Sequence, residues 1–300
     1  MIKAIHRIKK FNKQDSFNIF ISILPIIVLT FVIILYPLIS VFYHGFTNWN
    51  LTGAQFNGLL NYKNLINSGN LLLLLKNNFF LLFSIPIQIF LSLIIAYLIY
   101  QEVPSWQFFR IIFYLPAVFS SVVIGFLFRT FFSLNGPLNE VFRATRLDLL
   151  VVNWLNKGST AFIVVSIALI WSQFGMAVLI FLSGMGPIEK SILESAEVDG
   201  ANFWGKFIHI ILPMIVSTIE FYLVTLVIIF FTASFGFIYS ITSGGPGYST
   251  TTLEYMIYTK AFKSILFGQS SALATILFFI VLVIVIVILR IFKKLGNWEE

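Results

Sequence analysis

The sequence predicts an all-α membrane protein with six transmembrane helices, and three observations lead to that fold class. Of the 300 residues, 59% are hydrophobic and only 10% are charged, against about 25% charged in a typical soluble domain. The mean hydropathy is +0.96. Six stretches are each long enough to cross a bilayer, which takes about 20 apolar residues. So little charge cannot cover a soluble globule, and so much apolar sequence excludes a disordered chain.

The six apolar stretches are continuous rather than alternating, which indicates helices and not barrel strands. They cover residues 18–43, 77–100, 108–132, 160–184, 208–239 and 271–292. The first is too long for a signal peptide, and no small-residue cleavage site follows it. The fifth is too long for one straight helix. We expect it to begin at Pro213 and to lose its regularity near Gly236. Together the stretches form one transmembrane domain over residues 18–292.

Basic residues near both ends of the chain set the predicted topology. They are Lys3, Arg7, Lys9, Lys10 and Lys13 at the start and Arg290, Lys293 and Lys294 at the end. Basic flanks mark the cytoplasmic side of membrane spans, and an even number of spans puts both ends on one side. We therefore expect cytoplasmic tails at 1–17 and 293–300 and a cytoplasmic loop at 185–207. We attribute the net charge of +7 to these basic flanks, which orient the chain in the membrane, and not to a surface that binds nucleic acid.

Residues that hold metals or form disulfides are scarce. The chain has no cysteine and only three histidines, which lie far apart in the sequence at His6, His44 and His209. This pattern lacks the ligand spacing of a zinc site, so no metal site is predicted.

One polar loop stands out from the others, the segment Ile192–Pro213. Its apolar residues recur at helical spacing, whereas Glu194, Glu197 and Asp199 fall off that face. Asp199-Gly200 favours a turn, so we expect two short helical pieces joined there. A short acidic amphipathic piece suits the groove of a soluble protein partner. The alternative is a helix resting on lipid, but such helices are usually rich in Lys and Arg.

The same segment resembles the signature loop, or EAA motif, of permease subunits in binding-protein-dependent ABC importers. The family pattern is Glu-x-Ala-x-x-Asp-Gly-Ala, a Phe six residues later, and Ile-x-Leu-Pro. The matching positions are Glu194, Ala196, Asp199, Gly200, Ala201, Phe207, Ile210, Leu212 and Pro213, and Ser195 stands where the family usually has a second alanine. Just upstream, Pro187 precedes Ile188 instead of following it.

Several shorter matches, which follow one another in the order expected for the family, resemble its carbohydrate-importing branch. The permeases of this branch are similar to the larger subunit of the maltose transporter. Among these pieces are Asn61-Tyr62, Leu115-Pro116, Gly136 with Asn139, and Gly244-Gly245-Pro246. The resemblance runs from about Phe56 to the end of the sixth span and implies the fold of a type I ABC importer permease.

The resemblance also implies partners. The signature loop would be a coupling helix that docks on a separate ATPase subunit, two of which hold ATP and Mg. A second permease subunit and an extracytoplasmic sugar-binding protein would complete the importer in the bacterial cytoplasmic membrane. Glu194 would meet a basic group on the ATPase, Gly200 would provide the turn, and Ala196 and Ala201 would permit close approach.

This chain itself is expected to bind no cofactor and to be no enzyme. The run Gly200–Lys206 matches the start of a phosphate-binding loop, but Phe207 stands where Ser or Thr is required, and no predicted strand precedes it.

A substrate path for a sugar needs aromatic faces and groups that bind hydroxyls. The candidates near the middle of the membrane are Trp171, Gln173, Thr232, Ser234, Phe235 and Tyr239. The alternative for each is helix packing, since small polar residues are common between membrane helices. An Asp common in the family at this stretch corresponds to Gly236 here.

Glu220 is the one acidic residue well inside a predicted span. An intramembrane carboxylate is a functional candidate by default. It supports an alternative function of another class, a secondary transporter driven by an ion gradient with Glu220 as its proton site. A structural or gate role is the other interpretation. The docking loop and the lack of a visible inverted repeat argue against the secondary transporter.

Overall fold

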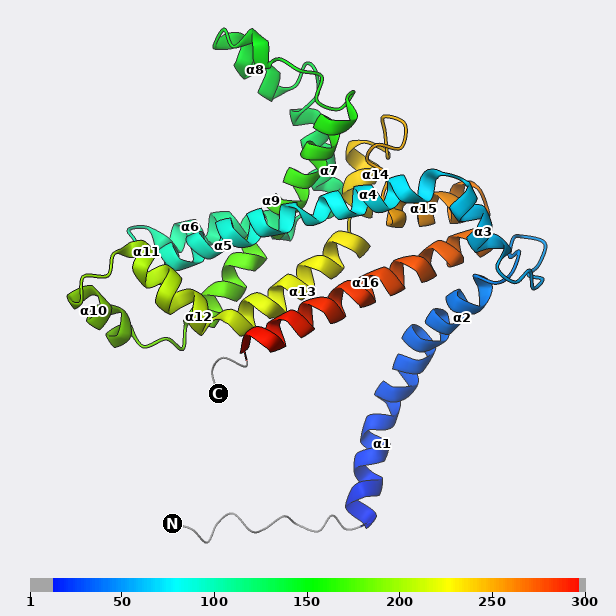
Figure 1. The fold of residues 1–300 in the computed structure, drawn as a ribbon, viewed down its shortest axis with the longest axis horizontal. Helices are drawn as coiled ribbons and strands as arrows, with labels where there is room; N and C mark the ends of the chain where they lie inside the picture. The colour runs from blue at the N-terminus through cyan, green and yellow to red at the C-terminus, as the bar shows by residue number, and fades with distance from the viewer. Residues whose placement is uncertain (1–12, 297–300) are drawn as a thin grey trace.

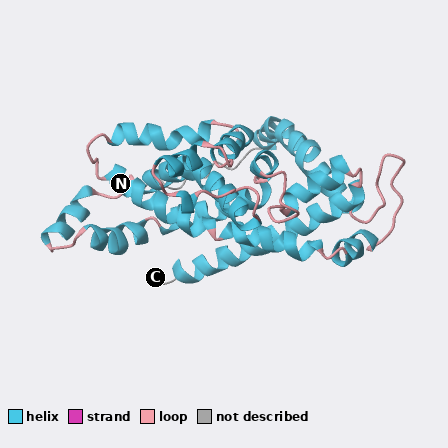
Figure 2. Cartoon of the chain, turned by 90° about the horizontal axis from the view of Figure 1, so that it is seen from above, coloured by secondary structure: helices cyan, strands magenta, loops and turns pink. Residues whose placement is uncertain are grey.

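A computed structural model describes residues 13–296, and its longest helices run roughly side by side (Figure 1). Figure 2 shows helices and loops throughout, and the described part holds no β-structure beyond the isolated bridges Thr47–Phe56 and Asn50–Gly53. Four helices are long and apolar enough to cross a membrane, and two bent helix pairs raise the number to as many as six. This confirms the predicted fold class. Of the predicted tails 1–17 and 293–300, residues 1–12 and 297–300 lie outside the described part of the chain.

The first span is a helix of three segments that lies apart from the others (Figure 1). It consists of α1 (Lys13–Thr30), the π-helical η1 (Phe31–Leu35) and α2 (Tyr36–His44). The most apolar window of this span has no buried residue. Its last segment, α2, packs against the bundle, where the Phe42 ring meets the Phe278 ring at 5.3 Å.

The second span begins earlier than predicted. After α3 (Leu60–Asn67), α4 (Asn70–Leu82) and α5 (Ser84–Tyr100) form one run of 31 residues from Asn70 to Tyr100. Polar residues around position 77 interrupt the apolar run, and for this reason the span was predicted to start only at residue 77. In the structure Asn77 and Asn78 are buried inside the helix bundle.

The third predicted span, 108–132, is divided in two. α6 (Trp106–Tyr114) continues into the 3-10 helix η2 (Leu115–Val118), and α7 (Ser121–Phe131) then departs at an angle of 100°. Pro116 lies in the segment before the bend, and proline interrupts helical hydrogen bonding. Ser120 starts the next helix by accepting a hydrogen bond from the Val123 amide at 3.3 Å. A short arm follows, with α8 (Pro137–Ala144) and η3 (Asp148–Leu150).

The fourth span, α9 (Gly158–Met185), is continuous and matches the predicted 160–184 closely. It packs along α5 and against α6. Gly175 permits the contact with α6, because a Cβ atom there would lie 2.9 Å from the carbonyl carbon of Phe113. Small residues bring membrane helices close enough for van der Waals packing and hydrogen bonds, which hold such bundles together in lipid.

The loop before the fifth span contains α10 (Lys190–Val198), which lies at the end of the bundle opposite to α3 (Figure 1). The fifth span is then broken into α11 (Phe203–Lys206), η4 (Phe207–Ile211), α12 (Leu212–Met214), α13 (Val216–Thr232) and α14 (Phe235–Ile241). The helices before and after Ile215 are bent by 74°. The main helix thus starts three residues after the predicted Pro213, and it ends at Thr232, before the predicted Gly236.

The last part of the chain consists of α15 (Leu253–Tyr258), η5 (Thr259–Lys263) and α16 (Phe267–Gly296). The C-terminal end of α16 lies at the same end of the bundle as α10 (Figure 1). The largest fully buried side chains come from several spans and include Tyr97, Ile124, Phe181, Tyr222, Phe230 and Phe231.

Candidate functional site

The loop at 185–207 forms the two short helical pieces that the sequence predicts, and its signature residues build the turn between them. Gly200 has φ +85°, a left-handed conformation that favours glycine. The Ala201 amide donates to the Ala196 carbonyl at 2.8 Å, and the Gly200 amide donates to the Glu197 carbonyl at 3.0 Å. These two bonds define a Schellman motif, which satisfies carbonyls at the end of a helix. The spacing of Ala196, Gly200 and Ala201 is therefore that of a helix stop.

The next helix starts at once, because Asn202 caps it. The Asn202 Oδ1 atom accepts a hydrogen bond from the Gly205 amide at 2.8 Å, which satisfies a free donor of the first turn of α11. The following apolar residues turn inward. The Phe203 and Phe207 rings lie 4.9 Å and 5.4 Å from the ring of Tyr97 at the end of the second span. The loop is thus seated on the second span by aromatic contacts.

Polar contacts fix the loop at both ends of α10. The Tyr100 hydroxyl donates to the Ile188 carbonyl at 2.8 Å. Lys190 pairs with Glu102 at 3.0 Å, which raises the pKa of the Lys190 ammonium. At the far end Lys206 pairs with Glu197 at 2.8 Å. The hydrogen bond and the charge of Lys206 lower the pKa of the Glu197 carboxyl.

The outward face of α10 stays open. Glu194, Ser195 and Asp199 are all exposed, and the Ser195 hydroxyl donates back to the Ser191 carbonyl at 2.8 Å. Neither Glu194 nor Asp199 has a hydrogen bond or ion pair within residues 13–296. A groove of about 400 Å³ runs beside Glu194 and is lined by Tyr100, Gln101, Glu102, Lys190, Leu193, Glu194, Glu197 and Lys206. Phe207 is buried, whereas Pro213 lies in α12 at the entry to the fifth span. The loop therefore presents unpaired carboxylates on a rigid support.

Three of the six predicted path residues lie together at the break between α13 and α14. Ser234 is buried there, and the Phe235 ring stacks on the Tyr239 ring at 5.5 Å. The structure adds residues that the sequence reasoning missed. The Phe235 ring also contacts Tyr258 at 4.7 Å, and the carboxylate of Glu254 reaches the same break. Burial raises the pKa of the Glu254 carboxyl, against the effect of hydrogen bonds from Ser234 and Phe235.

The other predicted path residues lie elsewhere. The Thr232 hydroxyl bonds back to the Ile228 carbonyl at 2.8 Å, and the residue lines an apolar groove between the first span, α13 and α16. Trp171 packs against Phe128 of α7 at 5.7 Å. Gln173 contributes its backbone carbonyl, which accepts from the Tyr222 hydroxyl at 3.1 Å. The contacts of Trp171 and Gln173 join two helices and are the helix packing that formed the alternative interpretation.

Gly236 is also a packing residue. A Cβ atom at this position would lie 2.8 Å from the Cβ atom of Ser121, so α14 and α7 approach each other closely here. An aspartate side chain, which the family often has at the corresponding position, would collide with α7. The carboxylate of Glu254 instead reaches this region from α15.

Glu220 is half-buried in α13 and has no hydrogen bond or ion pair in the described part of the chain. No titratable group of a second span pairs with it there. Nor do three His, Cys, Asp or Glu side chains within residues 13–296 gather closely enough to hold a metal ion.

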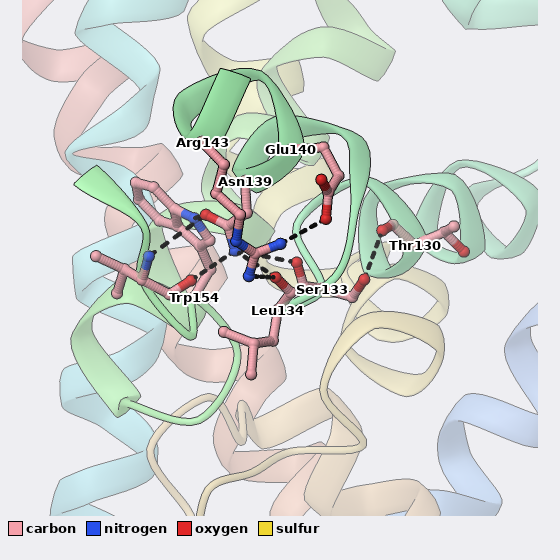
Figure 3. A network of polar contacts seen from close by, with 8 residues as sticks. Thr130, Ser133, Leu134, Asn139, Glu140, Arg143 and Trp154 are labelled. Carbon is pink, nitrogen blue, oxygen red and sulfur yellow. Dashed lines mark hydrogen bonds and ion pairs between the residues drawn. The ribbon is translucent and has the colours of Figure 1, made fainter. Parts of the chain in front are cut away.

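The arm between the third and fourth spans is organised by one buried amide (Figure 3). The Asn139 Nδ2 atom donates to the carbonyls of Ser133, Leu134 and Val152 at 3.2, 3.1 and 2.9 Å. Its Oδ1 atom accepts from the Val152 amide at 3.3 Å and the Trp154 indole at 3.2 Å. In Figure 1 the arm, with α8, projects from the bundle.

Comparison with known proteins gives close relatives over almost the whole chain. The chain is 31% identical over 277 residues to the multiple sugar-binding transport system permease protein MsmF of Streptococcus mutans, which covers 91% of this chain and 93% of that protein. It is 30% identical over 270 residues to the lactose transport system permease protein LacF of Rhizobium radiobacter, over 89% of this chain and 90% of that protein. The sn-glycerol-3-phosphate permease protein UgpA of Agrobacterium fabrum is 28% identical over 278 residues, 92% and 94% of the two chains.

Solved structures share the fold. A chain of a bacterial ABC transporter involved in the import of the acidic polysaccharide alginate superposes with a TM-score of 0.78 at 24% identity, over 94% of this chain and 96% of that one. The same transporter type in complex with an alginate pentasaccharide-bound periplasmic protein gives a TM-score of 0.79 at 23% identity, with the same coverage. No protein-family model matches the chain.

Proposed function

The chain belongs to the family of ABC transporter permease subunits that includes the carbohydrate transport permeases, and from this membership we propose that it carries a sugar or sugar derivative across the bacterial cytoplasmic membrane. A separate ATPase subunit drives the transport, and an extracytoplasmic binding protein delivers the substrate. A second permease subunit completes the pore. Both termini lie in the cytoplasm, as the basic residues at the chain ends predict.

The observation that carries the proposal is the geometry of the loop at 185–207. Its helix α10 is stopped by the Gly200 turn, fixed at both ends, and exposes Glu194 and Asp199 without partners in the described chain. A rigid, acidic, unpaired helix at the end of the bundle suits a groove on a protein with basic side chains. We propose that this coupling helix docks on the ATPase. A rigid docked element transmits a rigid-body motion between two bistable parts.

The substrate path runs past the break between α13 and α14. Ser234 offers a hydroxyl, and Phe235 and Tyr239 offer stacked aromatic faces of the kind that bind sugar rings. The chain itself performs no catalysis in this proposal. ATP and Mg belong to the partner ATPase subunits, which close on the nucleotide and move the docked helices.

The test is ATP-dependent sugar uptake into proteoliposomes that hold the complete transporter. Uptake is expected to require ATP, the binding protein and both permeases, and to be lost when the ATPase subunits are left out. Uptake by this chain alone that collapses with an uncoupler and with Glu220→Gln would instead identify an ion-gradient transporter. Family membership argues against that outcome.

A further inference from the structure

Glu254 is a charged residue to which the proposed coupling to ATP gives no role. It belongs to α15, in the connection between the fifth and sixth spans. Its Oε2 atom accepts hydrogen bonds from the Ser234 hydroxyl at 2.9 Å and from the Phe235 amide at 2.8 Å. Both bonds end on the same oxygen. The second carboxylate oxygen, Oε1, receives neither of them.

The position of this carboxylate is tightly fixed. The amide of the preceding residue, Leu253, donates to the Asn78 Oδ1 atom of the second span at 2.8 Å. The Thr252 hydroxyl caps α15 by accepting from the Tyr255 amide at 3.3 Å. Ser234, which donates to the carboxylate, is itself fully buried. A group held this way acts as a preorganised acceptor, because little reorganisation is needed when a ligand arrives.

Within residues 13–296 no basic side chain forms an ion pair with the carboxylate. The ion pairs among the described residues join Glu140, Glu102 and Glu197 to basic partners, and Glu254 is in none of them. The Lys263 ammonium instead lies 5.7 Å from the Tyr255 ring and 5.9 Å from the Tyr258 ring. The donors that the described residues offer it are the neutral Ser234 hydroxyl and Phe235 amide.

Aromatic rings cluster around Phe235, whose amide donates to this carboxylate. The Phe235 ring contacts Tyr255 at 6.1 Å and Tyr258 at 4.7 Å, and the Tyr258 ring contacts Phe262 at 5.5 Å. Tyr239 is 42% exposed and Phe262 is 72% exposed. Aromatic faces beside a strong hydrogen-bond acceptor are what a sugar needs, since its ring stacks and its hydroxyls donate.

We propose that Glu254 is a specificity-determining residue of the substrate path, which accepts hydroxyl hydrogen bonds from uncharged saccharides and disfavours anionic ones such as uronates and sugar phosphates. The inference rests on the proposed function, because it assigns the substrate class at the path of a sugar importer. An anionic sugar would bring a second negative charge next to Glu254 in a poorly solvated place, where like charges repel strongly. Specificity of this kind comes from the repulsive element as much as from the attractive one.

The experiment measures binding at this site in the complete transporter. The chain contains no cysteine, so Phe262→Cys, with partner subunits freed of cysteine, gives one reactive thiol next to Tyr258 in the aromatic cluster around Phe235. The rate of thiol labelling is measured with increasing maltotriose or lactose, and with trigalacturonate as the anionic probe. The same titrations are repeated with Glu254→Gln, which keeps the size and an acceptor but removes the charge. Glu220→Gln, a half-buried acid of the neighbouring α13, is the matched control.

With Glu254 present, a neutral sugar is expected to protect the thiol at a concentration at least about tenfold below that of the uronate, where tenfold corresponds to about 1.4 kcal/mol. Glu254→Gln is expected to reduce this ratio to about threefold or less, and Glu220→Gln to leave it unchanged. An equal ratio in the Glu254→Gln variant overturns the proposal, as does protection by the uronate at the lower concentration. Absence of protection by any of these sugars, while ATP-driven uptake of one of them persists, also overturns it. Absence of sugar uptake altogether overturns the proposed function instead.

Discussion

The amide of Ala201 donates a hydrogen bond to the carbonyl of Ala196 at 2.8 Å, across a turn that only Gly200 takes with ease. This bond closes the end of α10 and directs the chain back towards the bundle. The glycine of the sequence signature is therefore needed for the left-handed backbone conformation of this turn. The small side chains on both sides of the turn leave the outer face of α10 open for a partner.

Gly200→Ala tests the turn without adding bulk. No atom lies within 4 Å of the Cβ position, so the only strain comes from φ +85°, which costs a non-glycine residue about 1–2 kcal/mol. That cost shifts a conformational population by roughly 5–30-fold. We expect a several-fold loss of substrate-stimulated ATP hydrolysis in the reconstituted transporter, with normal insertion of the chain into the membrane.

The matched control for this substitution is Gly186→Ala. Gly186 lies in the same loop, has φ −53° and leaves 3.3 Å between a Cβ atom and the nearest oxygen. We expect it to keep nearly full activity. Equal activity of the two variants would show that the left-handed turn is dispensable for coupling.

Asn77→Leu tests how the second span holds the connection before α15. The Asn77 Nδ2 atom donates to the carbonyls of Tyr248 and Thr251 at 2.9 and 2.8 Å. Leucine of similar size leaves the buried Thr251 carbonyl unpaired, at a cost of about 1–3 kcal/mol. We expect a lower midpoint of thermal unfolding in detergent and faster proteolysis within residues 242–252. Asn67→Leu, at an exposed site with no side-chain hydrogen bond in the described chain, is the control, and an equal shift in both variants would contradict the role of Asn77.

The spans and the two helical pieces of the loop at 185–207 could be predicted from the sequence because their signals are local. Hydropathy marks an apolar run, and the Asp199-Gly200 turn is encoded by adjacent residues. The predicted boundary of a span was wrong where polar side chains form hydrogen bonds with groups far away in the sequence. Asn77 lowers the local hydropathy and so suggests the end of a span, yet its hydrogen-bond partners lie 171 and 174 residues away in the sequence.

The six residues predicted for the substrate path do not all lie together, for a related reason. Ser234, Phe235 and Tyr239 are close in sequence and were found together, but Thr232 precedes the helix break and faces a different groove. Glu254 reaches Ser234 from 20 residues away. Its one visible signal was a carboxylate in an apolar stretch between two spans. Beyond the bend at Phe119–Ser120, α7 packs against α14, a contact between segments more than 100 residues apart that local sequence does not show.

The ion pair between Glu197 and Lys206 predicts a pH dependence of the loop. The lysine lowers the pKa of the Glu197 carboxyl below its ordinary 4.5. A lowered pKa in the folded state means that the pair stabilises the loop fully above pH 4.5. The contribution is lost as the pH falls through the lowered pKa. We expect faster amide hydrogen exchange in α10 below pH 4.5, after correction for intrinsic exchange.

Glu197→Gln should remove this pH dependence, because the glutamine side chain does not titrate. The effect is expected to be small, since the Glu197 side chain is 71% exposed and screened by water. Glu189→Gln, which removes a carboxylate without an ion pair in the described loop, should leave the dependence intact. If both variants behave like the unmodified chain, the pair does not hold α10.

Asn139→Ala tests the arm that carries α8. The substitution removes five hydrogen bonds from a side chain with no exposed surface and leaves the carbonyl of Val152 and the indole of Trp154 without their partner. A buried polar group left unpaired costs about 1–3 kcal/mol. The arm projects from the bundle (Figure 1), so the loss should unfold residues 133–157 locally and leave the spans intact. We expect rapid proteolysis confined to that segment, with an almost unchanged midpoint of global unfolding.

Asn153→Ala, at an exposed asparagine of the same arm, should remain resistant to the protease. Global unfolding of the Asn139→Ala variant would instead show that the arm is part of the cooperative core of the transmembrane domain.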